Sequence, residues 1–143
     1  IVCSSQEESY GRGATTAANI INADSTVVID VDYGNTPDVD KKICGILGKG
    51  PTIALSVETD RRLTKKLISL TDEKELPAKV VLNPTSTGTN ANHYVNSETG
   101  IPTVAVGIPQ RNMHTPLEVI NTKDVEYAAT LISKYILDQY EIK

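Results

Sequence analysis

The chain has 143 residues and a formal net charge of −4, from 14 basic and 18 acidic residues. It has neither the basic cluster that a nucleic-acid partner requires nor an apolar run of about 20 residues that could span a membrane, so we expect neither partner. Because Phe and Trp are absent, the core is expected to consist of Val, Ile, Leu and Ala, a composition typical of a parallel sheet flanked by helices.

Short apolar or β-branched runs predict strands, and apolar residues recurring every three or four positions predict helices. The expected strands are residues 1–4, 26–31, 52–55, 79–82 and 103–107. The expected helices are residues 13–22, a segment capped by Asp60 that runs to about residue 74, residues 90–96, and a segment after Thr122 that runs through Ile136. This alternation predicts a layered α/β/α sheet with helices on both faces, in which functional side chains gather at the carboxyl ends of strands.

The first predicted strand is followed by two adjacent carboxylates, Glu7 and Glu8. A strand end that turns can place both in one cleft, where one carboxylate binds a metal and the other acts as a general base. Exposed glutamates are common, however, and the pair alone favours the simpler interpretation of a solvated turn.

Two further strand ends offer metal ligands. Asp30 lies inside an apolar run, where a carboxylate is costly unless it is paired or coordinated. His114 follows the last predicted strand, although a lone histidine in a loop is more often structural than a ligand. Together with the glutamates, these residue types suit Zn²⁺, Co²⁺ or Mn²⁺. Asp32, at the edge of the next loop, is interpreted as a turn residue.

The remaining candidates are weaker. Gly11 and Gly13 lack the third glycine of a dinucleotide fingerprint and indicate a tight turn before a helix. His93 is expected on a short helix, in a structural role. The two cysteines, Cys3 and Cys44, have the spacing of neither a disulfide scaffold nor a zinc knuckle. We interpret both as small buried residues in a reducing, cytoplasmic environment.

Five segments in chain order resemble one known family, the metallo-aminopeptidases that form tetrahedral dodecamers. This family includes glutamyl and deblocking aminopeptidases, some of them labelled endoglucanases. The segments are QEE with YGRGA within residues 6–14, IDV with NTP within 29–37, LGKGP at 47–51, GTNAN at 88–92 and IPQRNMHTPLEV at 108–119.

The resemblance implies a role for each matching residue. Glu7 would be the general base or acid, Glu8 and His114 would bind one metal ion, and Asp30 would bind the second. The cofactors would be two divalent ions, Zn or Co, acting on peptide substrates in a homo-oligomer that is a dodecamer in the family. Substrate contacts would fall to Asn90, Arg111 and Thr115.

The family's other metal ligands lie before the QEE segment, as does its inserted PDZ-like domain. We therefore expect residues 1–143 to be the C-terminal portion of a metallopeptidase catalytic domain, without the N-terminal strands, and inactive alone. Three residues depart from the family pattern, because Asn90, Asn112 and Asp32 stand where Asp, Tyr and Thr are usual.

Other functions remain open. The chain could be a non-catalytic remnant of the fold, an assembly module, or a related exopeptidase or deacylase. A glycosidase gains no support from Glu7 and Glu8, because glycosidase carboxylates must flank a sugar bond from two sides.

Overall fold

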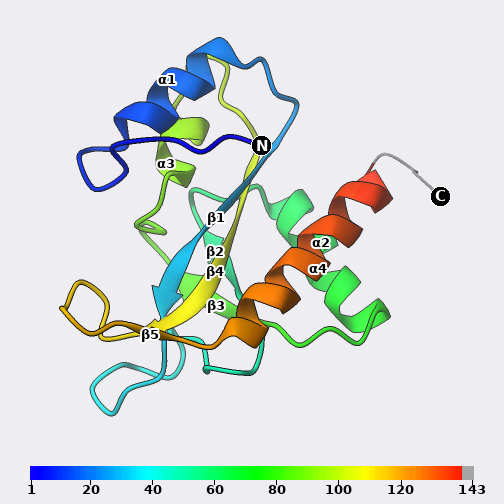
Figure 1. Ribbon diagram of the computed structural model, residues 1–143. Helices are drawn as coiled ribbons and strands as arrows, with labels where there is room; N and C mark the ends of the chain where they lie inside the picture. The colour runs from blue at the N-terminus through cyan, green and yellow to red at the C-terminus, as the bar shows by residue number, and fades with distance from the viewer. Residues whose placement is uncertain (140–143) are drawn as a thin grey trace.

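The computed structural model describes residues 1–139, and its centre is a five-stranded sheet (Figure 1). The strand order is β1-β4-β2-β3, and β5 pairs with β4 off this path. The strands are β1 (Thr26–Tyr33), β2 (Thr52–Ser56), β3 (Lys79–Asn83), β4 (Thr103–Arg111) and β5 (Val119–Ile120).

The sheet is mixed, which corrects the expectation of a parallel sheet. β1 runs parallel to β4, whereas β2 runs antiparallel to β4 and parallel to β3. The carboxyl ends of β1 and β4 therefore lie at one end of the sheet, and those of β2 and β3 lie at the other. A composition rich in Val and Ile indicates burial on both faces but carries no information about strand direction.

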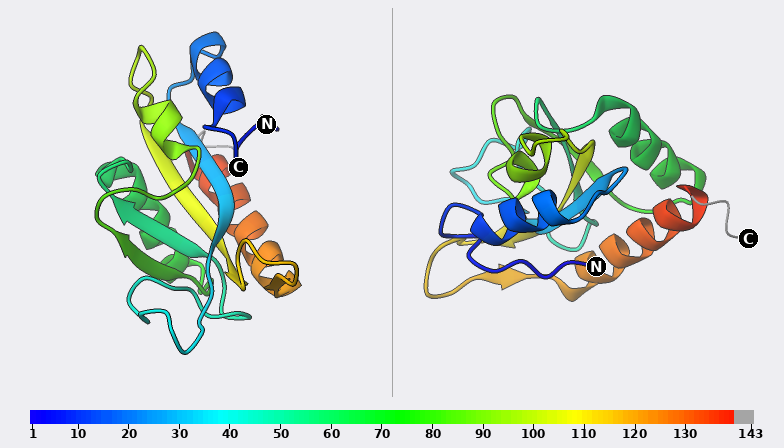
Figure 2. Two further views of the ribbon diagram at one scale, coloured as in Figure 1. Left: turned by 90° about the vertical axis from the view of Figure 1, so that its left-hand side faces the viewer. Right: turned by 90° about the horizontal axis from the view of Figure 1, so that it is seen from above.

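Helices cover both faces of the sheet, as predicted (Figure 2). The helices α2 (Arg61–Glu73) and α4 (Thr122–Gln139) bury the larger core against one face, around Leu67, Val104 and Leu131. The short helix α3 (Ala91–Val95) covers the opposite face, where Ala91 packs with Val28 and Val81. The helix α1 (Arg12–Ile20) packs against α3.

Residues 1–4 do not form the predicted strand. They belong to no strand of the sheet, and residues 1–3 are exposed, including Cys3, which was expected to be buried; Cys44 is buried as expected. An apolar run becomes a strand only where a neighbour accepts its backbone hydrogen bonds. β4 extends through Arg111 and is therefore longer than the strand predicted at residues 103–107. The short strand β5 was not predicted. The other helices and strands begin and end within about two residues of their predicted bounds.

Within the part of the chain that the structure describes, no helix is both long and apolar enough to cross a membrane.

Candidate metal and peptide site

The two adjacent glutamates lie in a turn that leads into α1. The turn is closed by hydrogen bonds from Gly11 N to Glu7 O (3.0 Å) and from Gly13 N to Ser5 O (3.1 Å). Gln6 and Tyr10, on either side of the pair, have positive φ angles of 59° and 68°. Such a conformation costs a non-glycine residue about 1–3 kcal/mol and is concentrated at functional sites. The turn is therefore a shaped segment and not a simple solvated loop.

Glu8 and His114 are brought together although they are far apart in sequence. Glu8 Oε1 lies 3.5 Å from His114 Nε2, and their side chains are 77% and 70% exposed. His114 has a φ angle of 60°, and its backbone N–H donates to Glu118 Oε1 at 2.6 Å. Glu118 thus holds the loop that presents His114. Sequence reasoning included Glu118 only as part of a motif and missed this role.

Asp30 lies on β1, close enough to the glutamates for the charges to interact. Burial raises the pKa of Asp30; the hydrogen bond donated by Val31 N (2.8 Å) opposes this change, and the charge of Glu8 adds to it. The pKa of Glu7 is also raised, first by burial and then by the charges of Asp30 and Glu8. Three carboxylates therefore share one neighbourhood, where a bound cation would relieve their repulsion.

The pair Glu8–His114 fits a shared metal ion. Zinc bonds of 2.0–2.1 Å in a tetrahedron place two ligand atoms about 3.4 Å apart, close to the 3.5 Å between Glu8 Oε1 and His114 Nε2. No group of three or more His, Cys, Asp or Glu side chains that could hold a metal occurs among residues 1–139. The described residues therefore assemble one pair at ligand spacing, Glu8 and His114.

Each of the three predicted substrate contacts hydrogen-bonds to another residue of the chain. Arg111 donates from Nε to Asn35 O (2.9 Å) and from Nη2 to Asn35 Oδ1 (3.1 Å). Thr115 Oγ1 donates to Asn112 O at 2.7 Å. Asn90 precedes α3 and donates from Nδ2 to Ser4 Oγ at 3.2 Å, while its buried Oδ1 has no partner among the described residues.

His93 has the structural position that was predicted for it. Its Nδ1 lies 3.0 Å from Thr15 Oγ1, so the ring joins α3 to α1. Gly11 lies beneath the ring with a φ angle of 55°, and a Cβ added there would come within 2.0 Å of His93 Nε2. The tight turn before α1 therefore needs glycine at this position, both for its conformation and for the space taken by the imidazole.

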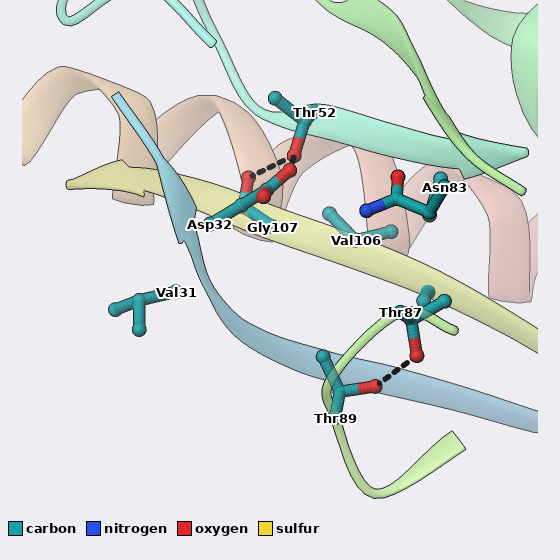
Figure 3. Close-up of a pocket in the computed structure, with 10 residues that line it drawn as sticks. Val31, Asp32, Thr52, Asn83, Thr87, Thr89, Val106 and Gly107 are labelled. Carbon is teal, nitrogen blue, oxygen red and sulfur yellow. Dashed lines mark hydrogen bonds between the residues drawn. The ribbon is translucent and has the colours of Figure 1, made fainter. Parts of the chain in front are cut away.

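Asp32, which was interpreted as a turn residue, is instead part of β1 and lines a hollow on the sheet (Figure 3). Its Oδ2 accepts from Thr52 Oγ1 at 2.5 Å, and its Oδ1 accepts from Tyr33 N at 2.7 Å. The two side chains meet over Gly107, where an added Cβ would lie 2.4 Å from both Asp32 Cβ and Thr52 Oγ1. Burial raises the pKa of Asp32 against these hydrogen bonds. Its spacing of two from Asp30 could have revealed that both share one face.

Comparisons with known proteins identify the family of this chain. The profile described as M42 glutamyl aminopeptidase matches residues 1–131. A lysyl aminopeptidase from Pyrococcus furiosus is 32% identical over 139 residues, which cover 97% of this chain and 40% of that protein. The crystal structure of a TET aminopeptidase from a marine sediment archaeon of the Thaumarchaeota matches with a TM-score of 0.83 at 26% identity, over 91% of this chain and 37% of that one.

A third protein shares the fold at lower identity. The TET1 peptidase of Pyrococcus horikoshii matches with a TM-score of 0.64 and 22% identity, over 90% of this chain and 38% of that chain. That peptidase can assemble into a tetrahedron or a large octahedral shell. The chain spans 37–40% of the length of these relatives.

Proposed function

Because the chain belongs to the M42 glutamyl aminopeptidase family, we propose that it supplies part of a metal-dependent site that removes the N-terminal residue from peptides. The observation that carries this proposal is the approach of Glu8 Oε1 to His114 Nε2 at 3.5 Å, beside Glu7 and Asp30. A carboxylate and an imidazole at ligand spacing, with two further carboxylates near them, form an acidic centre suited to divalent cations.

Glu8 and His114 would hold one divalent ion, and Asp30 would hold a second, with zinc or cobalt as the proposed metals. When bound, such ions lower the pKa of water and polarise a peptide carbonyl. Glu118 keeps His114 in place through its backbone N–H. The left-handed φ angle of Gln6 and the hydrogen bond from Gly11 N to Glu7 O hold the turn that carries both glutamates.

Glu7 is proposed as the group that moves the proton. Its carboxylate would accept a proton from the attacking water and return it to the leaving amine. The raised pKa of Glu7, caused by burial and by Asp30 and Glu8, favours this exchange because an effective catalyst has a pKa near the working pH. Asn90, Arg111 and Thr115 are proposed to contact the peptide.

The isolated chain is proposed to hydrolyse peptides poorly. Only one pair of ligands is assembled among residues 1–139, so each ion would lack ligands. Assays of this chain with aminoacyl anilides and added Co²⁺ or Zn²⁺ should show little turnover. Brisk hydrolysis by the chain alone would contradict an incomplete site.

The role of Glu7 can be tested in the natural protein that contains this chain. Glu7→Gln should lower kcat by at least about 10²-fold, because removing a positioned general base costs that much. Glu98→Gln, an exposed glutamate in the connection between α3 and β4, is the matched control and should leave kcat unchanged. If Glu7→Gln retained full kcat, the proposed proton transfer would be wrong.

A second candidate function is a non-catalytic remnant of the fold or an assembly module. The natural protein distinguishes the two, because a remnant would hydrolyse no aminoacyl anilide at any metal concentration.

We also propose homo-oligomeric assembly. A cytoplasmic location is proposed because both cysteines are free thiols.

A further inference from the structure

Residues 5–13, the glutamate turn, are held from outside by α3 and by the residue that precedes it. Directly before the turn, Asn90 Nδ2 donates to Ser4 Oγ at 3.2 Å. Towards the other end of the turn, the His93 ring lies against Gly11, so closely that an added Cβ there would come within 2.0 Å of Nε2. The helices α3 and α1 lie side by side (Figure 1). One short segment therefore contacts the chain on both sides of the two glutamates.

The glutamate turn needs such contacts because its backbone is strained. Gln6, Tyr10 and Gly11 have φ angles of 59°, 68° and 55°. Left-handed conformations of non-glycine residues persist only where the surrounding structure enforces them. Gly11 N also donates to Glu7 O at 3.0 Å. The residue that lies against the His93 ring is therefore the same residue that fixes the backbone of Glu7.

The hydroxyl of Thr15 fixes the orientation of the His93 ring. Thr15 Oγ1 donates to Gly11 O at 3.2 Å and lies 3.0 Å from His93 Nδ1. With its own proton directed to the carbonyl, the hydroxyl can accept a hydrogen bond from a protonated Nδ1. The ring is thus bound at Nδ1 and packed against the turn at Nε2, so these three residues form one connected group.

The helix α3 also connects this group to the strand that carries Asp30. Ala91 is fully buried and packs with Val28, two residues before Asp30 on β1. The pKa of Glu7 is raised first by burial and then by nearby carboxylates that include Asp30, and the charge of His93 acts in the opposite direction. Both Asp30 and His93 therefore lie within electrostatic range of the Glu7 carboxylate.

We propose that His93 is a positioning residue that holds the glutamate turn in the place where Glu7 can serve the reaction. This inference rests on the proposed aminopeptidase function and adds a residue on which its rate depends. His93 acts through Gly11 and Glu7 and touches no reacting atom. Because a misplacement of about 1 Å can lower a rate by about 10²-fold, a small relaxation of the turn is enough to slow catalysis.

The kinetic test separates the position of Glu7 from the binding of the substrate. In the natural, metal-loaded protein that contains this chain, His93→Ala should lower kcat for an aminoacyl anilide by at least about tenfold and leave KM within about threefold. An unchanged kcat, or a raised KM with kcat unchanged, would overturn the inference.

Two neighbouring threonines of α1 provide a matched pair of variants. Thr15→Val and Thr16→Val each remove a hydroxyl that donates to the carbonyl four residues earlier, but within residues 1–139 only Thr15 also hydrogen-bonds to His93. Thr15→Val should lower kcat by about 3–10-fold, and Thr16→Val should leave kcat within about twofold. Equal effects of the two substitutions would overturn the inference. Both threonines are exposed, so this comparison remains decisive if His93→Ala fails to fold.

Amide hydrogen exchange tests the same contact without turnover. In His93→Ala and in Thr15→Val, the N–H of Gly11 should exchange at least about tenfold faster. The N–H of Thr64 in α2, which donates to Asp60 O at 2.9 Å, should keep its rate. Unchanged exchange at Gly11 would overturn the inference whatever the kinetics. If the natural protein hydrolyses no anilide, the proposed function fails, and this measurement still decides whether His93 holds the turn.

Discussion

Glu58 shows how one buried carboxylate ties three segments together. The residue is 6% exposed and lies in the loop after β2. Its Oε2 accepts from the N–H and the hydroxyl of Thr87, both at 2.7 Å, and its Oε1 accepts from Asn92 Nδ2 at 3.0 Å. Burial alone would raise the pKa of Glu58, but the hydrogen bonds from Thr87 and Asn92 outweigh it, and the pKa is lowered. Glu58 therefore holds the loop before α3, and α3 itself, in place.

The lowered pKa predicts a pH-dependent contribution to stability. A glutamate whose pKa is lower in the folded than in the unfolded state stabilises the fold above its ordinary pKa of 4.5. That stabilisation is lost as the pH falls through the folded-state value. Glu58→Gln should lower the free energy of unfolding by about 1–3 kcal/mol at neutral pH, and the difference should shrink under acid conditions. Urea unfolding followed by circular dichroism, at neutral pH and under acid conditions, measures this difference in the free energy of unfolding. Glu98→Gln is the control. A difference independent of pH would contradict the assignment.

Carboxylates at the start of α2 and α4 join these two helices to the rest of the fold. Asp60 precedes α2 and accepts from Leu63 N at 2.8 Å, as an N-cap does, and Asp60 N donates to Thr103 O of β4 at 2.7 Å. The cap thus joins the helix to the sheet. At α4, the fully buried Asp124 accepts from Gly48 N at 2.7 Å and from Gly50 N at 2.8 Å. It anchors the loop that leads into β2.

Removing the cap of α2 should cost a small and defined amount. Asp60→Ala removes one hydrogen bond to the helix and should lower the free energy of unfolding by about 1 kcal/mol. Asp72→Ala changes the same residue type at the other end of α2, where a carboxylate opposes the helix dipole, and it should be neutral or slightly stabilising. Thermal unfolding of both variants tests the cap. Equal losses in the two variants would contradict a capping role for Asp60.

Asp124 should be more sensitive than Asp60, because it is buried and serves two donors. Asp124→Asn replaces one acceptor oxygen with an amide that cannot accept, so one backbone N–H is left unpaired at a cost of about 1–3 kcal/mol. Glu126→Gln, an exposed change on the same helix, controls for the loss of charge. Amide hydrogen exchange should show faster exchange at Gly48 or Gly50 in the Asp124 variant. Unchanged protection at both glycines would mean that the loop is held by other contacts.

The whole molecule combines a well-packed layered core with an exposed pair of metal ligands. Metal binding by this chain should therefore be weak. At about 1 mM Zn²⁺ the free energy of unfolding should rise by less than about 1 kcal/mol, as expected when the metal concentration is close to the dissociation constant. His114→Ala should abolish the zinc-dependent shift, and His93→Ala should keep it because the His93 ring joins α3 to Thr15 of α1. A shift of several kcal/mol that survives His114→Ala would place the ion elsewhere.

The predicted helices and strands agree with the structure where they depend on residues that are close together in the sequence. The predicted bounds of α2 and α4 are close to the observed ones because apolar residues at helical spacing face one core. The expectation of helices on both faces of the sheet is confirmed. The strand predicted at residues 1–4 is wrong because pairing, and not composition, makes a strand. The sheet was expected to be parallel, but β2 runs antiparallel to β4, and strand direction has no signature in the composition of a short apolar run.

The candidate site also combines residues that the sequence identifies with contacts that only the tertiary structure shows. Glu7, Glu8, Asp30 and His114 were identified from residue type, position and resemblance, and their roles remain predictions. The sequence by itself determined most of the helices and strands and the residue types available for chemistry, because backbone preference and side-chain periodicity act over a few residues. Only the tertiary structure decided that Glu8 lies against His114, that Glu118 holds the His114 loop, and that Asp32 meets Thr52 over Gly107. These contacts join segments distant in the chain, and their geometry follows from sheet register and helix packing.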